Sequence, residues 1–399
     1  MFKNIVFVIC LSISSSLAVS LDEMVETVLS NNQDIKSLEH SINIANTQIE
    51  LSTNWNNPTL TLGVNDIQFD NPSKRDIEAM QAQYIGLSQV IPMGDKLALQ
   101  KEISLKDKKI ALYRLEDKKI QLKSLVYEYA YRIVVLEKKY TLLTKYLQNT
   151  KSLEELSNSL YANGKMNQTD IIDLKISYSQ TILQQKNLQN LISNLYLKLE
   201  EITYTKIDTI ELSTKMKSIK LLKEFDAHPK LLILKEQGLQ YNDISQLELE
   251  KRTSDIKLNV SYFNRDSKYE DYANISLNIP LALYGTEKVK SIKAKQKANE
   301  LKSKLLNLKN SFNYSVLMLQ NDLDNAFFSY NTIKEMILPL KEDVQKNIDS
   351  YNRFSLTSPQ TTIKNLNDVI KYELLLLDEV KKYFTAYSKS LYFTQGEMK

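Results

Sequence analysis

The chain has little of what small-molecule active sites are usually built from. Its 399 residues include 1 cysteine, 2 histidines and 7 glycines. The cysteine, Cys10, lies in the apolar N-terminal segment, so the rest of the chain can form neither disulfides nor thiolate metal sites. The histidines, His40 and His228, lack acidic partners at ligand spacing, and the scarcity of glycine favours long helices over a pocketed fold. We predict no enzyme activity and no catalytic, metal-binding or cofactor-binding residue.

An excess of charge of one sign is also missing. The net charge is +4, and lysines alternate with acids along the helical faces instead of clustering. Nucleic acid therefore has no basic surface to bind. After Ser20, no segment reaches the length of a transmembrane helix without a charged residue.

The N-terminus has the pattern of a signal peptide. One lysine within residues 1–4 precedes an apolar stretch over 5–17, and Ala18-Val19-Ser20 supplies the small residues that a signal peptidase reads. We expect export and cleavage near Ser20, with residues 1–20 removed. A membrane anchor is the alternative, but it needs about 18 apolar residues and finds about 13. Cys10 follows Val8-Ile9 instead of a small residue, so we expect no lipid anchor.

The rest of the chain contains one pattern twice: two short strands, a very long helix and a shorter returning helix. A shift of 196 residues lays Pro58–Val64 on Ser254–Val260. The spacing predicts a first repeat over 21–204, a connector over 205–227 and a second repeat over 228–399. The first repeat has strands at 59–69 and 84–91 and helices at 32–54, 94–160 and 169–204. The second has strands at 256–263 and 272–283 and helices at 228–253, 285–354 and 361–394.

Each long helix carries a seam of apolar residues spaced by three and four positions, as in a coiled coil, and only Lys119 interrupts the first seam. The first runs through Leu115, Leu122, Val126, Tyr129, Ile133, Leu136, Tyr140, Leu143 and Leu147, and the second through Leu319, Leu323, Ala326, Tyr330, Ile333, Ile337, Leu340 and Val344. A continuous helix over 94–160 would be about 100 Å long, deeper than an ordinary globular core. Pro339 predicts a kink, because the seam continues unchanged beyond it.

The strands alternate apolar and polar side chains, which separates two faces. Val260 and Leu277 lie on the apolar face and Asn259 and Ser276 on the polar one. A half-buried sheet in a soluble domain shows the same alternation. We favour a membrane sheet with Val260 and Leu277 facing lipid, because the remaining chain is committed to amphipathic helices. An open sheet cannot sit in lipid, so the chain must oligomerise into a closed barrel, with two copies giving eight strands and three giving twelve.

These segments together resemble a known family, the TolC-type outer-membrane efflux proteins. The resemblance rests on Asn57–Leu62, Gly86–Lys96, Leu160–Leu174, Leu277–Leu281, Gly285 and Ile337–Leu340, in this order. The run Leu87–Lys96 looks closest to the heavy-metal-efflux branch. The resemblance implies a homotrimer with a twelve-stranded β-barrel in outer-membrane lipid, continued by a periplasmic α-helical barrel. It also implies a passive exit duct that docks on a periplasmic adaptor and an inner-membrane pump, with the RND type among the candidates.

In that family, the turns between long and returning helices form the periplasmic tip, and acids after the second turn often ring the aperture. The adaptor-docking tips would here be Tyr161, Asn163 and Gly164 in the first repeat and Ser358 and Pro359 in the second. The aperture residues would be Asp170, Asp173, Lys364, Asn367 and Asp368.

The two repeats differ at the predicted aperture. A shift of 194 residues sets Asp170 against Lys364 and Asp173 against Asn367. An acidic ring from the second repeat is therefore in doubt, and we hypothesise mixed contacts between Asp170 or Asp173 and Lys364 of a neighbouring protomer. Alternatively these acids only stabilise a helix N-terminus, by about 0.3 to 1 kcal/mol each.

The competing interpretation is a periplasmic adaptor-like coiled-coil protein without a pore. Such a protein would have one helical hairpin interrupting a glycine-rich β domain, whereas this sequence has two hairpins and no such domain.

Overall fold

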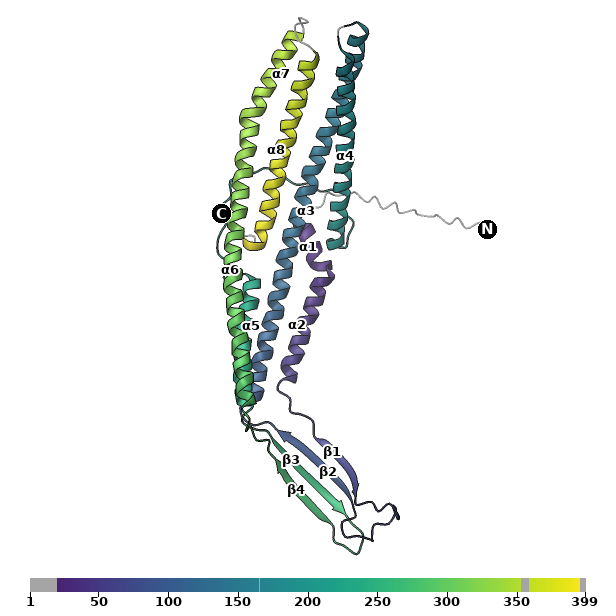
Figure 1. Cartoon of the computed structure of the whole chain (residues 1–399), viewed down its shortest axis with the longest axis vertical. Helices are drawn as coiled ribbons and strands as arrows, with labels where there is room; N and C mark the ends of the chain where they lie inside the picture. Colours follow the sequence, from purple (N-terminus) through teal and green to yellow (C-terminus); the bar gives the residue numbers. More distant parts are fainter. Residues whose placement is uncertain (1–19, 165, 353–358, 395–399) are drawn as a thin grey trace, which may run out of the picture. The chain divides into compact units, whose positions relative to one another are not determined.

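The computed structural model describes residues 20–164, 166–352 and 359–394 (Figure 1). The predicted signal peptide therefore lies outside the described residues, apart from Ser20. The chain divides into two compact units, one formed by residues 1–35, 118–225 and 311–399 and the other by 36–117 and 226–310. We call them the tip unit and the sheet unit, after the predicted tip turns and the sheet that they contain.

The elements follow the duplicated order that the sequence predicts. In the first repeat they are α1 (Leu21–Asn31), α2 (Gln33–Leu51), β1 (Thr59–Asn65), β2 (Ala82–Ile91), α3 (Lys96–Ala162) and α4 (Gln168–Thr203). In the second they are α5 (Pro229–Glu250), β3 (Ile256–Asn264), β4 (Tyr272–Asn278), α6 (Thr286–Thr332), the π-helix η1 (Ile333–Ile337), α7 (Leu338–Asn352) and α8 (Pro359–Thr394). None of the helices in these described ranges is long and apolar enough to cross a membrane.

Two strands end earlier than the alternation suggests. The strand expected over 59–69 stops at Asn65, because Asp66 turns the chain with φ of 54°. The strand expected over 272–283 stops at Asn278, just before Pro280, which has no N–H to donate to a neighbouring strand. In both places apolar residues continue the alternation outside the hydrogen-bonded ladder.

α1 is a separate helix, which the sequence pattern did not predict. Asn32 ends it with an extended backbone, φ −65° and ψ 124°. The Asn32 side chain then caps α2, because its Oδ1 accepts from the Asp34 N–H at 3.0 Å. Its Nδ2 donates to the Ile202 carbonyl at 3.1 Å, which ties the break to the end of α4.

The sheet unit contains a four-stranded antiparallel sheet in the order β1-β2-β3-β4. Lys96, at the start of α3, is 7% exposed, and its Nζ lies 2.5 Å from Asp255 Oδ1, just before β3. The same carboxylate oxygen accepts from the Met93 N–H at 3.0 Å. This contact joins the end of the β1–β2 hairpin to the beginning of the β3–β4 hairpin.

The tip unit is built on the seam of α3. Val126 and Ile133 are fully buried, and Leu122 and Leu143 are each 2% exposed, as the spacing predicts. The helix α8 packs against a different face of α3, where Tyr131 and Phe384 stack with ring centroids 4.0 Å apart. The connector is irregular and contacts α8, with the Tyr383 hydroxyl donating to the Lys217 carbonyl at 2.6 Å.

The second seam does not continue unchanged, and that prediction is wrong for the single chain. Leu323, Ala326 and Ile333 are buried, but Leu340 is 68% exposed and Val344 45% exposed. The cause is η1, where the Leu338 N–H bonds to the Ile333 carbonyl five residues earlier. A π-turn holds one extra residue and so rotates the helix that follows. It also opens the turn into which the Pro339 ring would otherwise clash.

Candidate functional site

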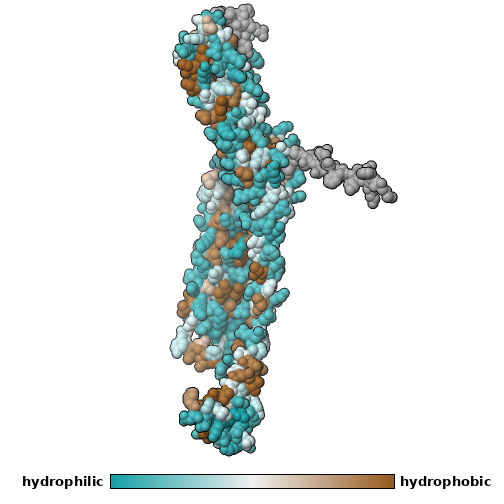
Figure 2. Space-filling model, turned by 90° about the vertical axis from the view of Figure 1, so that its right-hand side faces the viewer, coloured by the Kyte–Doolittle hydropathy of each residue, from teal (hydrophilic) through white to brown (hydrophobic). Residues whose placement is uncertain are grey.

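The sheet has one apolar face, and its register confirms the predicted grouping of side chains. Val260 is paired with Leu87 and Ile275, and Leu277 is paired with Leu258. Cross-strand partners share a face, so the apolar side chains form one surface. Its members are Leu60, Leu62, Val64, Ile85, Leu87, Leu258, Val260, Tyr262, Ile275 and Leu277. Leu277 is 61% and Val260 42% exposed, and Figure 2 shows hydrophobic residues at the surface of the sheet beside its hydrophilic loop end.

Two central rows of the opposite face carry polar or very small side chains. One row across the sheet is Thr59, Ser88, Asn259 and Ser276, and the next is Thr61, Gly86, Ser261 and Asn274. Asn259 Nδ2 donates to Ser276 Oγ at 3.2 Å. This face suits water, whereas the apolar face suits lipid.

The sheet is open at both sides. β1 and β4 are the edge strands, and each pairs with one neighbour only among the described strands. One side of each edge strand thus presents backbone N–H and C=O groups to a further strand. In hydrocarbon each unpaired group would cost several kcal/mol, so another chain must complete the sheet there.

The first predicted tip is a tight turn after α3. Gly164 has φ of 68°, a conformation that favours glycine, and its N–H donates to the Tyr161 carbonyl at 2.9 Å. Asn163 Nδ2 donates to the Ser159 carbonyl at 2.8 Å, which satisfies one of the last carbonyls of the helix. Tyr161 is 47% exposed, so its ring is available to a partner.

The second predicted tip lies largely outside the described residues. Ser358 belongs to the segment 353–358, which the structure does not describe. Pro359 begins α8. A proline suits the first turn of a helix, where its missing N–H would have no partner in any case.

The predicted aperture residues lie near the starts of α4 and α8. Asp170 is half-buried and Asp173 exposed in the first turns of α4. Asp368 Oδ2 lies 2.6 Å from Lys341 Nζ of α7. The hydrogen bond from Lys341 lowers the pKa of the Asp368 carboxyl, and the charges of Lys364 and Lys371 lower it further. The hypothesised contact of Asp170 or Asp173 with Lys364 would cross between protomers, and it stays a prediction.

Asn367 takes part in a contact that the sequence did not reveal. Its Oδ1 accepts from the Tyr146 hydroxyl of α3 at 2.5 Å, and that hydroxyl lies 2.9 Å from Ser177 Oγ of α4. Tyr146, Ser177 and Asn367 thus join α3, α4 and α8 beside an open cavity of about 300 Å³. The one signal in the sequence was the spacing of Lys139, Leu143, Tyr146 and Thr150 by three and four residues, which gives α3 a partly polar stripe.

A buried charge, Lys139, lies on the same stripe of α3. Lys139 is 8% exposed, and its Nζ is 2.6 Å from Asp378 Oδ1 of α8, which Lys381 also contacts at 3.0 Å. Burial lowers the pKa of Lys139 despite the hydrogen bond to Asp378. Burial alone would raise the pKa of Asp378, but the hydrogen bonds from Lys139 and Lys381 outweigh it and lower that pKa.

The histidines do not come together. His228 is fully buried and caps α5, with its Nδ1 accepting from the Lys230 N–H at 3.2 Å. His40 lies on an exposed part of α2. Within residues 20–164, 166–352 and 359–394, no cluster of histidine, cysteine and acidic residues could hold a metal ion.

Comparison with known proteins shows a similarity to one family. The family model described as outer membrane efflux protein matches residues 24–203. Over these residues, which lie in the first repeat, the chain is similar to that family. No curated protein sequence matches the chain.

Solved structures extend the likeness to the second repeat. The Campylobacter jejuni CmeC outer membrane channel has 15% identity and a TM-score of 0.73, covering 94% of this chain and 87% of its own. VceC from Vibrio cholerae has 10% identity and a TM-score of 0.77, covering 94% and 96%. The open state of Neisseria gonorrhoeae MtrE has 11% identity and a TM-score of 0.70, covering 92% and 88%. At these identities the likeness concerns the fold.

Proposed function

We propose that this protein is the outer-membrane exit duct of a tripartite efflux system. It conducts substrate passively across the outer membrane, and its partners supply the energy. The observation that carries this proposal is the four-stranded sheet, with one apolar exposed face, one polar face and two open edges. The family match over residues 24–203 and the channel folds of the similar solved structures support it.

The assembly that fits is a homotrimer. Single-chain outer-membrane barrels begin at eight strands, so one chain cannot close a barrel alone. Three copies would pair β4 of each protomer with β1 of the next and give twelve strands. The helices of the three copies would then form the periplasmic α-helical barrel.

The remaining partners follow from the resemblance. A periplasmic adaptor would dock on the tips, at Tyr161, Asn163 and Gly164 and at Ser358 and Pro359. An inner-membrane pump, with the RND type among the candidates, would deliver the substrate. The run Leu87–Lys96 favours metal ions as cargo.

The state of assembly tests this proposal directly. The mature protein, purified in detergent, should have the mass of three protomers and no stable folded monomer, because a lone sheet leaves both edges unpaired. Reconstituted in planar bilayers, it should form discrete conducting channels. A folded, monodisperse monomer in detergent-free buffer would contradict the channel function. It would instead favour an adaptor-like protein without a pore.

A further inference from the structure

The loops at one end of the sheet contact each other through several side chains. Residues 66–81 join β1 to β2 and residues 265–271 join β3 to β4, so both loops leave the strands at the same end. The helices of the sheet unit connect to the opposite strand ends. If those helices are periplasmic, as in the proposed function, the two loops lie at the outer mouth of the channel.

The polar face of the sheet is covered at this end. Ala82 is fully buried and Phe263 is 8% exposed, and the register places both side chains on the polar face. Phe263 stacks between Tyr84 and Tyr272, with centroid distances of 5.1 and 4.7 Å. Farther along the same face Asn274 is exposed. The two tyrosine rings flank Phe263, and Ala82 directly follows loop 66–81, so this loop is the segment next to the buried part of the face.

The 66–81 loop holds its own shape through Gln81, which is 3% exposed. Its Oε1 accepts from the Ile77 and Glu78 N–H groups at 3.0 and 3.2 Å. Its Nε2 donates to the Lys74 carbonyl at 3.0 Å. These bonds therefore fix the conformation of residues 74–81 of the loop.

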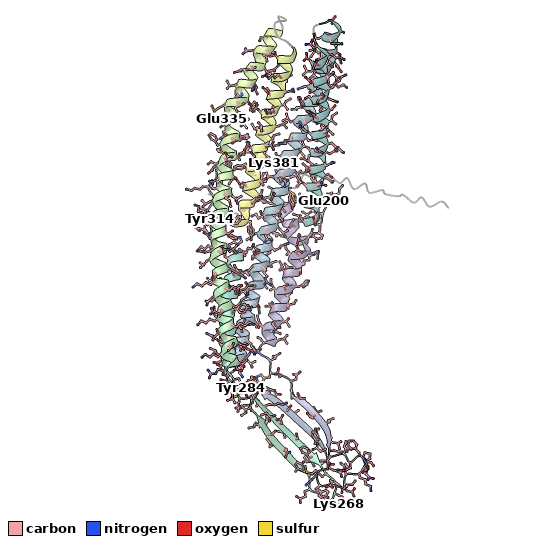
Figure 3. All side chains as sticks on the ribbon, in the orientation of Figure 1. Glu200, Lys268, Tyr284, Tyr314, Glu335 and Lys381 are labelled. Atoms are coloured by element: carbon pink, nitrogen blue, oxygen red, sulfur yellow. The ribbon has the colours of Figure 1, made fainter. Side chains whose placement is uncertain are left out.

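Two contacts join the two loops, and a third joins loop 66–81 to the end of β3. Lys268 Nζ lies 3.0 Å from Asp76 Oδ2, Arg265 Nη1 donates to the Ala79 carbonyl at 3.1 Å, and Arg75 Nη1 donates to Asn264 Oδ1 at 3.3 Å. Figure 3 labels Lys268 in the shorter loop, beside the longer one. The hydrogen bond from Lys268 lowers the pKa of the Asp76 carboxyl and so keeps it charged.

The shorter loop is the fixed partner in this contact. Asp271 Oδ1 accepts from the Arg265 N–H at 2.7 Å, and its Oδ2 accepts from Asn264 Nδ2 at 3.1 Å. The Arg265 guanidinium also lies 5.6 Å from the ring centroid of Tyr269 and 5.2 Å from that of Tyr272. The loop 265–271 thus presents Arg265 and Lys268 to the longer loop in defined positions.

We propose that loop 66–81 is a lid over the pore-lining face at the outer mouth, held by Arg265 and Lys268 of loop 265–271. Three such lids would narrow the mouth of a closed trimer, and opening would require release of the Asp76–Lys268 pair. This inference rests on the proposed channel function. It adds a second point of control, on a different part of the chain from the periplasmic tip.

A charge-swap series tests the lid. Asp76→Lys places two cations together and should release the loop, Lys268→Asp should do the same with two acids, and the double variant should restore the pair. A cysteine reporter, Asn274→Cys, lies on the polar face, and its rate of labelling by a bulky polymer-linked maleimide measures access through the mouth. In planar bilayers the single-channel conductance gives an independent readout. Asp70→Asn alters the charge of the same loop without touching these contacts and serves as the matched control.

In reconstituted trimers at low salt, each single variant should raise labelling of Asn274→Cys by up to about fivefold, the range expected for an exposed ion pair. The double variant and Asp70→Asn should label like the parent. At 1 M salt, where the Debye length is about 3 Å, the difference between parent and single variants should shrink. Equal labelling and equal conductance across the series, in channels that conduct, would overturn the lid alone. Absence of trimers and of conductance in the parent would instead overturn the channel function.

Discussion

At the scale of single residues, the membrane assignment depends on which face a strand residue occupies. Successive side chains of a strand point to opposite faces of the sheet, so a residue that faces lipid is followed by one that faces the pore. Val260 and Asn259 are neighbours in sequence and lie on opposite faces. Leu277 and Ser276 form the second such pair.

Arginine substitutions at these pairs should therefore give opposite results. Val260→Arg and Leu277→Arg should each cost about 2 to 4 kcal/mol per protomer if the site lies near the midplane of the bilayer. Asn259→Arg and Ser276→Arg should be tolerated, because water fills the pore. The yield of trimers inserted in the outer membrane measures the difference. Equal assembly of all four variants would show that the faces, and with them the membrane assignment, are wrong.

The buried Lys139 gives a second prediction at this scale. Asp378→Asn leaves an ammonium group on that stripe of α3 without its carboxylate and should lower stability by about 1 to 3 kcal/mol, less than for a fully buried pair because Asp378 is partly exposed. Lys139→Met together with Asp378→Asn should recover most of that loss. The midpoint of thermal unfolding of the detergent-solubilised protein reports both. Matching midpoints for Asp378→Asn and the parent would mean that the pair contributes nothing.

The same pair predicts a dependence on pH. The pKa of Asp378 is lower in the folded protein than in the unfolded chain, so its stabilisation is complete above the unfolded-state value of about 4. It is lost as the pH falls through the lower, folded-state pKa. The unfolding midpoints of the parent and Asp378→Asn should therefore converge below pH 4. A gap that persists at low pH would assign it to something other than the charge.

At the scale of elements, the π-turn decides which side of the second long helix is buried. Beyond it, Lys341 and Gln345 face α8, where Lys341 binds Asp368 and Asn365 Nδ2 donates to Gln345 Oε1 at 2.7 Å. Ile348, two turns after Lys341, is 6% exposed. One inserted residue thus moves Leu340 and Val344 to the outside and aligns a polar set with α8.

Removal of that extra residue should be tolerated. Deletion of Met336, which is 64% exposed, should turn η1 into a regular α-helical turn and keep both flanking faces in register. Pro339→Ala is included in this variant, because a regular turn cannot accommodate the proline ring. Deletion of Asp322, in the regular part of α6, is the control and should rotate every later residue out of place. Loss of trimer in both deletions, measured as yield in detergent, would refute this account.

At the scale of the whole molecule, the second repeat is not a copy of the first at the tip. Asp170 and Lys364 occupy corresponding positions with opposite charge. Within the chain Lys364 precedes Asp368 by one helical turn and lowers its pKa. The hypothesised contacts between protomers would therefore join two chemically different hairpins.

Reversal of the charge at Lys364 should loosen the resting aperture. In the hypothesised contact, Lys364 pairs with Asp170 or Asp173 of a neighbour, so Lys364→Asp would replace attraction by repulsion. Partly exposed pairs are worth about 0 to 1 kcal/mol, so conductance in planar bilayers should rise in part and in a salt-dependent way. Lys371→Asp also alters the charge near Asp368 and is the control. Unchanged conductance at low salt in Lys364→Asp and Asp170→Lys would leave these residues as helix caps.

The sequence alone determined the duplicated order, the long helices and the two faces of the sheet. These depend on local periodicity, which a single chain carries in its own spacing of apolar residues. Val260 and Leu277 could be placed on one face because alternation needs no knowledge of the partner strand.

Only the tertiary structure decided the π-turn, the Tyr146–Asn367 contact and the contacts between loops 66–81 and 265–271. Each joins residues distant in sequence or depends on packing that periodicity does not encode. By sequence spacing Leu340 belongs to the seam, but in the structure Lys341 faces α8 instead. A helix can hold one extra residue at a small cost in free energy when the packing beyond that residue improves. Asp76 and Lys268 are 192 residues apart, and only the antiparallel order of the four strands brings them together.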